Sequence, residues 1–189
     1  GTGELLRTVT WPPQVRVLHH WRNRGKGAAL RTALAEARGR YSTVMDADLE
    51  YSPSDLPALL APLRNGESRA VYGTRGFQAH SAYSFWYVIG NRAVTFAANL
   101  INNSWVSDIM TGHKAIETEL FLSLDLRERG FAVEAEITAR LLMRGVRIHE
   151  APVTSRSRPR ERGKERTAPR APPGHRAPLR RRVASTPHD

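Results

Sequence analysis

Two acidic side chains stand two positions apart just after a short apolar run. Residues 41–45 are β-prone, and Asp46 and Asp48 follow them directly. If the extended geometry continues, both carboxylates leave the same face of the chain, where their like charges repel. A shared divalent cation relieves that repulsion, and so does solvation in a loop after the strand. The spacing therefore indicates either a metal-binding strand end or a solvated acidic loop.

A glycine-containing turn with a lysine precedes these acids. Gly25, Lys26 and Gly27 separate an alternating run at residues 15–18 from a helical pattern that begins at Ala28. Free amides at a helix start, the positive end of the helix dipole and a lysine together suit a phosphate group. The Gly-x-Gly spacing lacks both the full dinucleotide fingerprint and the P-loop pattern. It predicts either a phosphate contact or a simple tight turn in which Lys26 is a solvated surface charge.

Further charged candidates follow other predicted strands. Arg75 comes after the β-prone residues 70–72, at the sheet edge expected to carry Asp48. There it either pairs a diphosphate in bidentate fashion or remains a plain surface arginine. Three acids are candidates for binding sugar hydroxyls or acting as a base, or else for satisfying a helix N-terminus: Asp108, Glu134 and Glu136. Three histidines lack metal-ligand spacing and are expected to be structural: His19, His20 and His113.

Hydrophobic periodicity predicts an α/β domain in which strands and helices alternate, with ligands at the carboxyl ends of the strands. Strands are expected at residues 15–18, 41–45, 70–72, 113–116 and 146–150. Helices are expected at residues 4–7, 28–37, 56–63, 119–124 and 137–142. Ser52, Pro53 and Asp55 form a box-like cap before the third of these helices.

The segment of residues 77–105 differs from the α/β pattern around it. It is aromatic and apolar, and its density predicts one long helix or two shorter ones. Tyr83, Trp86 and Tyr87 suit a membrane interface, where aromatic rings sit at headgroup depth. The alternative is a helix packed on the protein's own core.

Composition limits the classes of protein that remain. The chain has 189 residues with 40% apolar content, enough for one domain with a core. It has no cysteine, which excludes disulfides and thiolate metal sites. We find no signal-peptide pattern and no uninterrupted apolar run of membrane-spanning length, about 18 residues or more. The formal charge of +11 first suggests nucleic acid.

That positive charge is concentrated at one end of the chain. Residues 155–189 hold 11 Lys/Arg against 3 Asp/Glu, whereas residues 1–154 hold 18 against 15. The tail is rich in Arg and Pro and has few large apolar residues, so we expect it to be disordered. It is otherwise a basic arm for nucleic acid or anionic lipid, or, from about Thr167, an unrelated ending. The predicted domain is therefore residues 1–154, followed by this tail.

The order of the motifs carries a resemblance. They are Asn23-x-Gly25-Lys26-Gly27, Asp46-Ala47-Asp48-Leu49-Glu50, Gly73-Thr74-Arg75, Gly90-Asn91-Arg92, Asp108-x-x-Thr111-Gly112-x-Lys114 and Glu134-x-Glu136. In this order the chain resembles family-2 glycosyltransferases over about residues 1–165, and within them the dolichyl-phosphate mannose synthase type. The resemblance implies a GT-A (Rossmann-like) fold, a nucleotide-diphosphate sugar donor, Mg²⁺ or Mn²⁺, and a polyprenyl phosphate acceptor at a membrane surface. It also implies a peripheral enzyme on the cytoplasmic face, with nucleic acid not expected as a partner.

The resemblance also implies roles for particular residues. Asp46 and Asp48, helped by Glu50, would hold the metal, and Asp48, Asp108 and Glu134 would form the catalytic group. The nucleotide-sugar contacts would come from Gly25, Lys26, Gly27, Asp46 and Arg75. Arg158 and Lys164 would bind the acceptor phosphate.

Two departures from the family pattern accompany these matches. The family's first strand, with its Pro-x-Tyr-Asn-Glu-like segment, has no counterpart, so the GT-A fold is expected to be incomplete at its N-terminal strand. After Lys164 the Arg/Pro-rich tail replaces a helical continuation. We therefore expect a hexosyltransferase domain acting on polyprenyl phosphate by inverting displacement, in a fragment whose activity is open. The alternatives are a family-2 transferase acting on a saccharide or protein hydroxyl, and an inactive fragment that binds membrane or nucleic acid through its tail.

Overall fold

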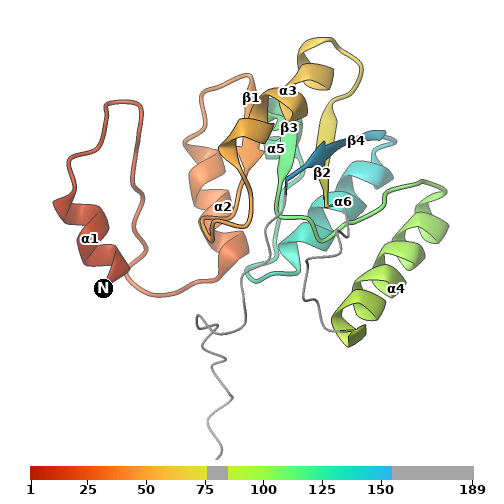
Figure 1. The fold of residues 1–189 in the computed structure, drawn as a ribbon, viewed down its shortest axis with the longest axis horizontal. Helices are drawn as coiled ribbons and strands as arrows, with labels where there is room; N and C mark the ends of the chain where they lie inside the picture. The colour runs from red at the N-terminus through yellow and green to blue at the C-terminus, as the bar shows by residue number, and fades with distance from the viewer. Residues whose placement is uncertain (76–84, 155–189) are drawn as a thin grey trace, which may run out of the picture. The chain divides into compact units, whose positions relative to one another are not determined.

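A single mixed β-sheet organises the computed structural model, which describes residues 1–75 and 85–154 (Figure 1). Its strands are β1 (Tyr41–Val44), β2 (Ala70–Arg75), β3 (Lys114–Glu117) and β4 (Ile148–Val153). Their order is β1-β3-β2-β4. β3 pairs antiparallel with β1 and β2, whereas β2 and β4 are parallel. β1, β2 and β4 therefore run in one direction and present their carboxyl ends at the same edge as the start of β3.

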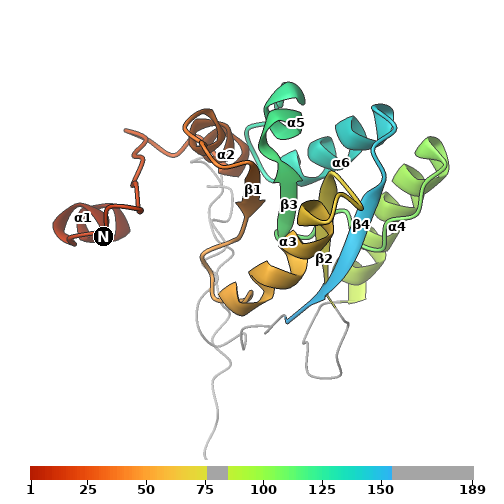
Figure 2. The ribbon, with the colours of Figure 1, turned by 90° about the horizontal axis from the view of Figure 1, so that it is seen from above.

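Helices lie on both faces of this sheet, except α1, which stands apart from it and has no buried residue (Figure 2). They are α1 (Thr2–Thr8), α2 (Lys26–Ala35), the 3-10 turn η1 (Pro53–Asp55), α3 (Leu56–Arg64), α4 (Phe85–Asn102), α5 (Thr118–Ser123) and α6 (Val133–Met143). α3 packs on β2, β3 and β4 from one side. α2, α5 and α6 lie on the other side, and α4 packs against α6. The layered α/β architecture predicted from periodicity is confirmed.

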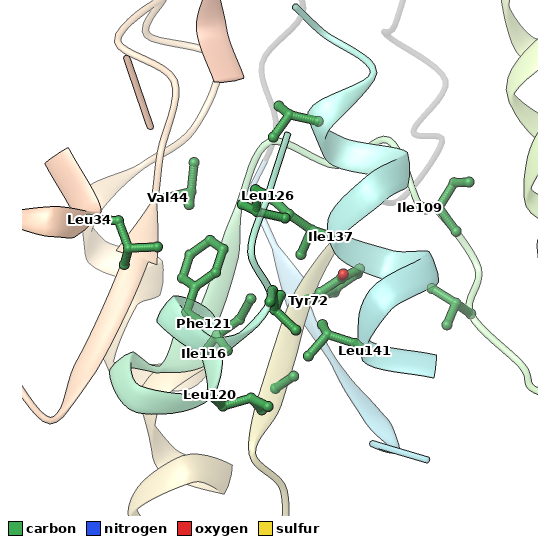
Figure 3. Packing of buried hydrophobic residues seen from close by; sticks show 14 residues of the cluster. Leu34, Val44, Tyr72, Ile109, Ile116, Leu120, Phe121, Leu126, Ile137 and Leu141 are labelled. Carbon is green, nitrogen blue, oxygen red and sulfur yellow. The ribbon is translucent and has the colours of Figure 1, made fainter. Parts of the chain in front are cut away.

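The larger core fills the space between the sheet and the α5 and α6 layer (Figure 3). Phe121 and Ile116 are at most 1% exposed, and Ile137 and Leu141 of α6 are fully buried beside Tyr72. Burying each such side chain contributes roughly 1.5–3 kcal/mol, so this cluster dominates the stability of the fold. A smaller cluster under α3 includes Tyr51, Leu59, Leu63, Val71 and Val153.

One predicted strand is wrong. Residues 15–18 form no strand, and Val15 and Leu18 remain 43% and 46% exposed. β1, the strand nearest in sequence, pairs with β3 alone in the sheet. An alternating pattern makes a strand only where its side chains pack, so this run stays unpaired although the outer edge of β1 is open. Arg16 of this run donates to the Glu36 carboxylate at 3.0 Å.

The start of α3 differs from the predicted box. The Ser52 side chain accepts from the Ser54 amide at 3.3 Å, and Pro53 occupies the first position, as expected. Asp55, however, turns its carboxylate to the amide of Thr154 at 2.8 Å. This contact ties the end of β4 to the start of α3, so Asp55 fastens the edge of the sheet rather than completing a cap.

The described part of the aromatic segment, residues 85–105, contains one long helix, α4. One side of α4 packs inward, because Thr95 is 5% exposed and its hydroxyl receives the amide of Ile109. Its outer side carries exposed apolar side chains: Ile89, Val94, Phe96, Leu100 and Ile101. Tyr83 and the side chains of Trp86 and Tyr87 lie outside the described part of the structure. Within residues 1–75 and 85–154, no helix combines the length and apolar content that crossing a bilayer requires.

Candidate functional site

The register of the sheet brings the sequence motifs to one edge. Val44 of β1 and Tyr72 of β2 both pair with Lys114 of β3. The acidic segment that follows Val44, the Gly-Thr-Arg segment that follows Tyr72 and the loop that leads into Lys114 therefore lie at the same sheet edge. The sequence predicted that the strand at residues 70–72 delivers Gly73, Thr74 and Arg75 to the sheet edge of Asp48. The two strands do end at a common edge, but β2 continues through Arg75. The side chain of Arg75 lies outside the described part.

Two glycines set the start of α2 against a neighbouring loop. Gly25 has φ +89°, and a Cβ atom there would meet the Arg129 carbonyl oxygen at 2.3 Å. A Cβ atom on Gly27 would meet the Glu128 carbonyl oxygen at 2.2 Å. The amide of Ala28 also donates to Arg129 O at 3.2 Å. Both positions therefore require glycine, because a side chain would collide with the neighbouring backbone. The sequence predicted a phosphate-binding or simple tight turn here, but not this packing against residues 128 and 129.

Lys26 is the first residue of α2 and is only 16% exposed as a side chain. Its ammonium nitrogen lies 2.7 Å from Oδ1 and 2.9 Å from Oδ2 of Asp46, and 2.7 Å from Oε1 of Glu134. Burial works to lower the pKa of Lys26, but the hydrogen bonds and charges of Asp46 and Glu134 outweigh it and raise the pKa above its ordinary value. The alternative of a solvated surface charge for Lys26 is therefore wrong.

Glu134 joins Lys26 to a second, deeper lysine. It is 2% exposed in the first turn of α6, and its Oε2 lies 2.5 Å from the ammonium of Lys114. Lys114 is fully buried beneath α6 and also donates to the carbonyl oxygens of Ile109 and Thr111. Burial lowers the pKa of Lys114, and the charge of Glu134 opposes that shift. The four charges of Asp46, Lys26, Glu134 and Lys114 form one neutral network.

The loop before β3 completes this network. Asp108 is 5% exposed and accepts from the Asn91 side chain and the Met110 amide, both at 3.0 Å. A Cβ atom on Gly112 would stand 2.5 Å from Oδ2 of Asp46, so this carboxylate lies directly on the glycine backbone. The structure thus brings the predicted residues Lys26, Asp46, Asp108 and Glu134 to one place, together with Lys114.

Glu136 and the histidines have contacts of other kinds. Glu136 accepts from the amides of Arg127 and Glu128 and pairs with Arg140. Its burial acts to raise its pKa, but these bonds prevail and lower it. Glu136 therefore ties the loop before α6 to the first turn of that helix. His113 is fully buried beside Tyr51, with ring centroids 5.1 Å apart, and burial lowers its pKa.

Asp48 and Glu50 do not continue the strand. β1 ends at Val44, the chain turns, and Leu49 adopts a left-handed φ of 65°. Asp48 Oδ1 accepts from the Glu50 amide at 3.1 Å. The extended geometry that would put Asp46 and Asp48 on one face is therefore wrong. No three His, Asp or Glu side chains in residues 1–75 and 85–154 gather to hold a metal ion, so the triple of Asp46, Asp48 and Glu50 is not assembled.

The chemistry of this edge still fits a divalent cation. Mg²⁺ is commonly held by one or two carboxylates together with substrate phosphates, and Asp46 and Asp48 supply two carboxylates. The ammonium of Lys26 against both oxygens of Asp46 shows that this carboxylate accommodates a cation. A divalent cation there would neutralise charge on a leaving diphosphate.

Lys114 belongs to the motif Asp108-x-x-Thr111-Gly112-x-Lys114, but the sequence did not predict its place in this network. It lies directly before Ala115 and Ile116 in a predicted strand, and a lysine in an apolar strand is a signal for a buried partner. The position of that partner in α6 depends on tertiary packing. The acceptor-phosphate residues Arg158 and Lys164, and the whole tail of residues 155–189, lie outside the described residues.

The fold, with its charged sheet edge, is an α/β fold of the GT-A class. Residues 1–123 match the model of Glycosyl transferase family 2, and the chain belongs to this family. It is similar to Glycosyltransferase AglJ of Haloferax volcanii, with 29% identity over 71% of this chain and 45% of that protein. It is also similar to polyprenol monophosphomannose synthase of Mycolicibacterium smegmatis, with 28% identity over 82% of this chain and 62% of that protein.

A solved structure shares the fold. It is glucosyl-3-phosphoglycerate synthase of Mycobacterium tuberculosis in complex with Mn²⁺, UDP-glucose and glycerol 3-phosphate. The TM-score is 0.51 with 25% identity, over 78% of this chain and 50% of that one. The chain thus spans about half the length of these relatives.

Proposed function

We propose that this chain transfers a hexose from a nucleotide-diphosphate sugar to a polyprenyl phosphate, with inversion at the anomeric carbon. An acceptor phosphate oxygen forms the new bond to that carbon, and the bond to the donor diphosphate breaks. Lys26, at the start of α2, is placed to bind the diphosphate, and we assign Asp46 and Asp48 to the divalent cation. A cleft of about 510 Å³ beside α2, lined by Arg16, Arg22 and Arg24 among others, supports the binding of an anionic nucleotide.

The choice of acceptor rests on the surroundings of the two candidate bases, Asp108 and Glu134. Glu134 is held between two ammonium groups, and Asp108 accepts two hydrogen bonds. Both carboxylates are also buried, with Glu134 2% and Asp108 5% exposed, so neither is open to the hydroxyl of an incoming acceptor. A sugar or protein hydroxyl needs a base to remove its proton, whereas a phosphate is already anionic near neutral pH. The network therefore favours a phosphate acceptor.

A lipid acceptor implies a membrane surface, and we propose the cytoplasmic face. The exposed apolar side of α4, with Phe96 and Leu100 68% and 71% exposed, supports contact with a bilayer. The name of the mycobacterial relative, a polyprenol monophosphomannose synthase, supports the same acceptor class.

Product analysis tests this proposal. The full chain is incubated with Mn²⁺ and labelled UDP- and GDP-hexoses, and with either polyprenyl phosphate or an oligosaccharide acceptor. We expect label in the lipid product alone, sensitive to mild acid as a glycosyl phosphate is. Label in the oligosaccharide instead would reject the phosphate acceptor and return Asp108 or Glu134 to the role of base.

A further inference from the structure

Lys26 forms an ion pair with Asp46, the carboxylate that we assign to the divalent cation. Lys26 Nζ touches both oxygens of Asp46, at 2.7 and 2.9 Å. A divalent cation bound to Asp46 would lie next to this ammonium, and two positive charges so close repel each other strongly. The two cations therefore compete for one carboxylate.

The two ends of the Lys26 network differ in exposure. The Asp46 side chain is 35% exposed, whereas that of Glu134 is 3% exposed and is shared with Lys114. Water and ions can reach Asp46. If Lys26 left Glu134, however, that buried carboxylate would keep only Lys114 as its partner. The contact with Asp46 is therefore the one that can be exchanged, while the contact with Glu134 anchors the lysine.

We infer that Lys26 is an internal counter-cation that holds Asp46 in the donor-free protein and exchanges with the divalent cation when a nucleotide diphosphate binds. On release, Lys26 stays on Glu134 and turns its remaining donors to the diphosphate, whose negative charge replaces that of Asp46. The consequence is that the metal binds poorly alone and well together with the nucleotide. This inference rests on the proposed function, because it assumes the donor site at this edge.

The test measures Mn²⁺ binding rather than activity. Mn²⁺ is titrated into the full chain and into the Lys26→Met variant, with free Mn²⁺ followed by electron paramagnetic resonance, first without nucleotide and then with UDP or GDP. Without nucleotide, we expect Lys26→Met to bind Mn²⁺ about tenfold more tightly than the unaltered chain, because Asp46 is released. With nucleotide present, that advantage should shrink, because the variant lacks a ligand for the diphosphate.

Arg38→Met is the matched control, since it removes one positive charge from an exposed position just after α2 that does not line the cleft. It should leave Mn²⁺ affinity within about twofold, because solvent screens exposed charges. Equal Mn²⁺ affinity in Lys26→Met and the unaltered chain, both without nucleotide, overturns the exchange but leaves the donor site intact. No Mn²⁺ binding with or without nucleotide rejects the donor site itself, and the exchange with it.

A second measurement needs no variant and covers the case in which Lys26→Met does not fold. The chain has three lysines, Lys26, Lys114 and Lys164, so acetylation of Lys26 is readily followed by mass spectrometry. Mn²⁺ alone, at saturating concentration, should raise the acetylation rate of Lys26 severalfold by releasing it, and UDP or GDP should then lower it. The α-amino group of Gly1 is the internal reference. A Lys26 rate that does not respond to Mn²⁺ would contradict the inference.

Discussion

Replacing Lys114 by Met should lower the free energy of unfolding by about 3–5 kcal/mol, as expected when one partner of a buried ion pair is removed. The Glu134 carboxylate, which is 3% exposed, would keep only one of its two cations. The carbonyl oxygens of Ile109 and Thr111 would lose the ammonium group that donates hydrogen bonds to them. It would also remove the ammonium that lies 4.6 Å from the centre of the Tyr72 ring. Urea unfolding at neutral pH, followed by circular dichroism, measures the change.

The control for Lys114 is a long cation on the surface. Arg127 pairs with Asp125 at 3.1 Å, but both side chains are exposed, by 78% and 69%. Arg127→Met should therefore cost no more than about 1 kcal/mol. The double variant Lys114→Met with Glu134→Gln should lose less than the sum of the single changes, because no unpaired buried carboxylate remains. An effect of Lys114→Met as small as that of Arg127→Met would show that this lysine is not a structural charge.

The secondary structure was largely predictable because its periodic signals were strong. β2 and β3 carried short β-prone runs, and α2, α3 and α6 carried apolar residues at helical spacing. Residues 15–18 had the same alternation, yet they form no strand, because their apolar side chains gain no packed neighbours: Val15 and Leu18 remain 43% and 46% exposed. Local pattern thus predicts the tendency of a segment, and the neighbouring segments decide whether it is realised.

The sequence predicted which residues belong to the site, but not which of them form ion pairs with one another. Lys26, Asp46 and Glu134 were each singled out by type and position, but they are up to 108 positions apart in the chain. The sheet register and the close packing of Gly112 on Asp46 bring them together. The metal triple failed for a local reason, since the turn at Asp48 and the left-handed Leu49 separate carboxylates that an extended strand would have aligned.

Asp48→Ala should abolish sugar transfer, with a fall of about a hundredfold or more in rate, while changing stability little. Asp48 is partly exposed, and the Glu50 amide donates to it at 3.1 Å in a turn that solvent reaches, so water replaces this bond at little cost when it is lost. Its proposed function is different in kind, because a carboxylate that helps hold a divalent cation stabilises the charge on the leaving diphosphate. The assay is the formation of labelled glycosyl polyprenyl phosphate, with unfolding followed in parallel.

Asp48→Asn separates the charge of this residue from its turn. Asparagine keeps a side-chain oxygen that can accept the Glu50 amide, but it lacks the negative charge that a hard cation requires. If the charge matters, Asp48→Asn should lose transfer as severely as Asp48→Ala and should unfold at the same urea concentration as the unaltered chain. If Asp48→Asn instead retains transfer while Asp48→Ala loses it, the residue acts by shaping the turn, and the cation must then rely on Asp46. In that case Asp46, the carboxylate that Lys26 already holds, would be the only one of the two carboxylates left to bind the metal.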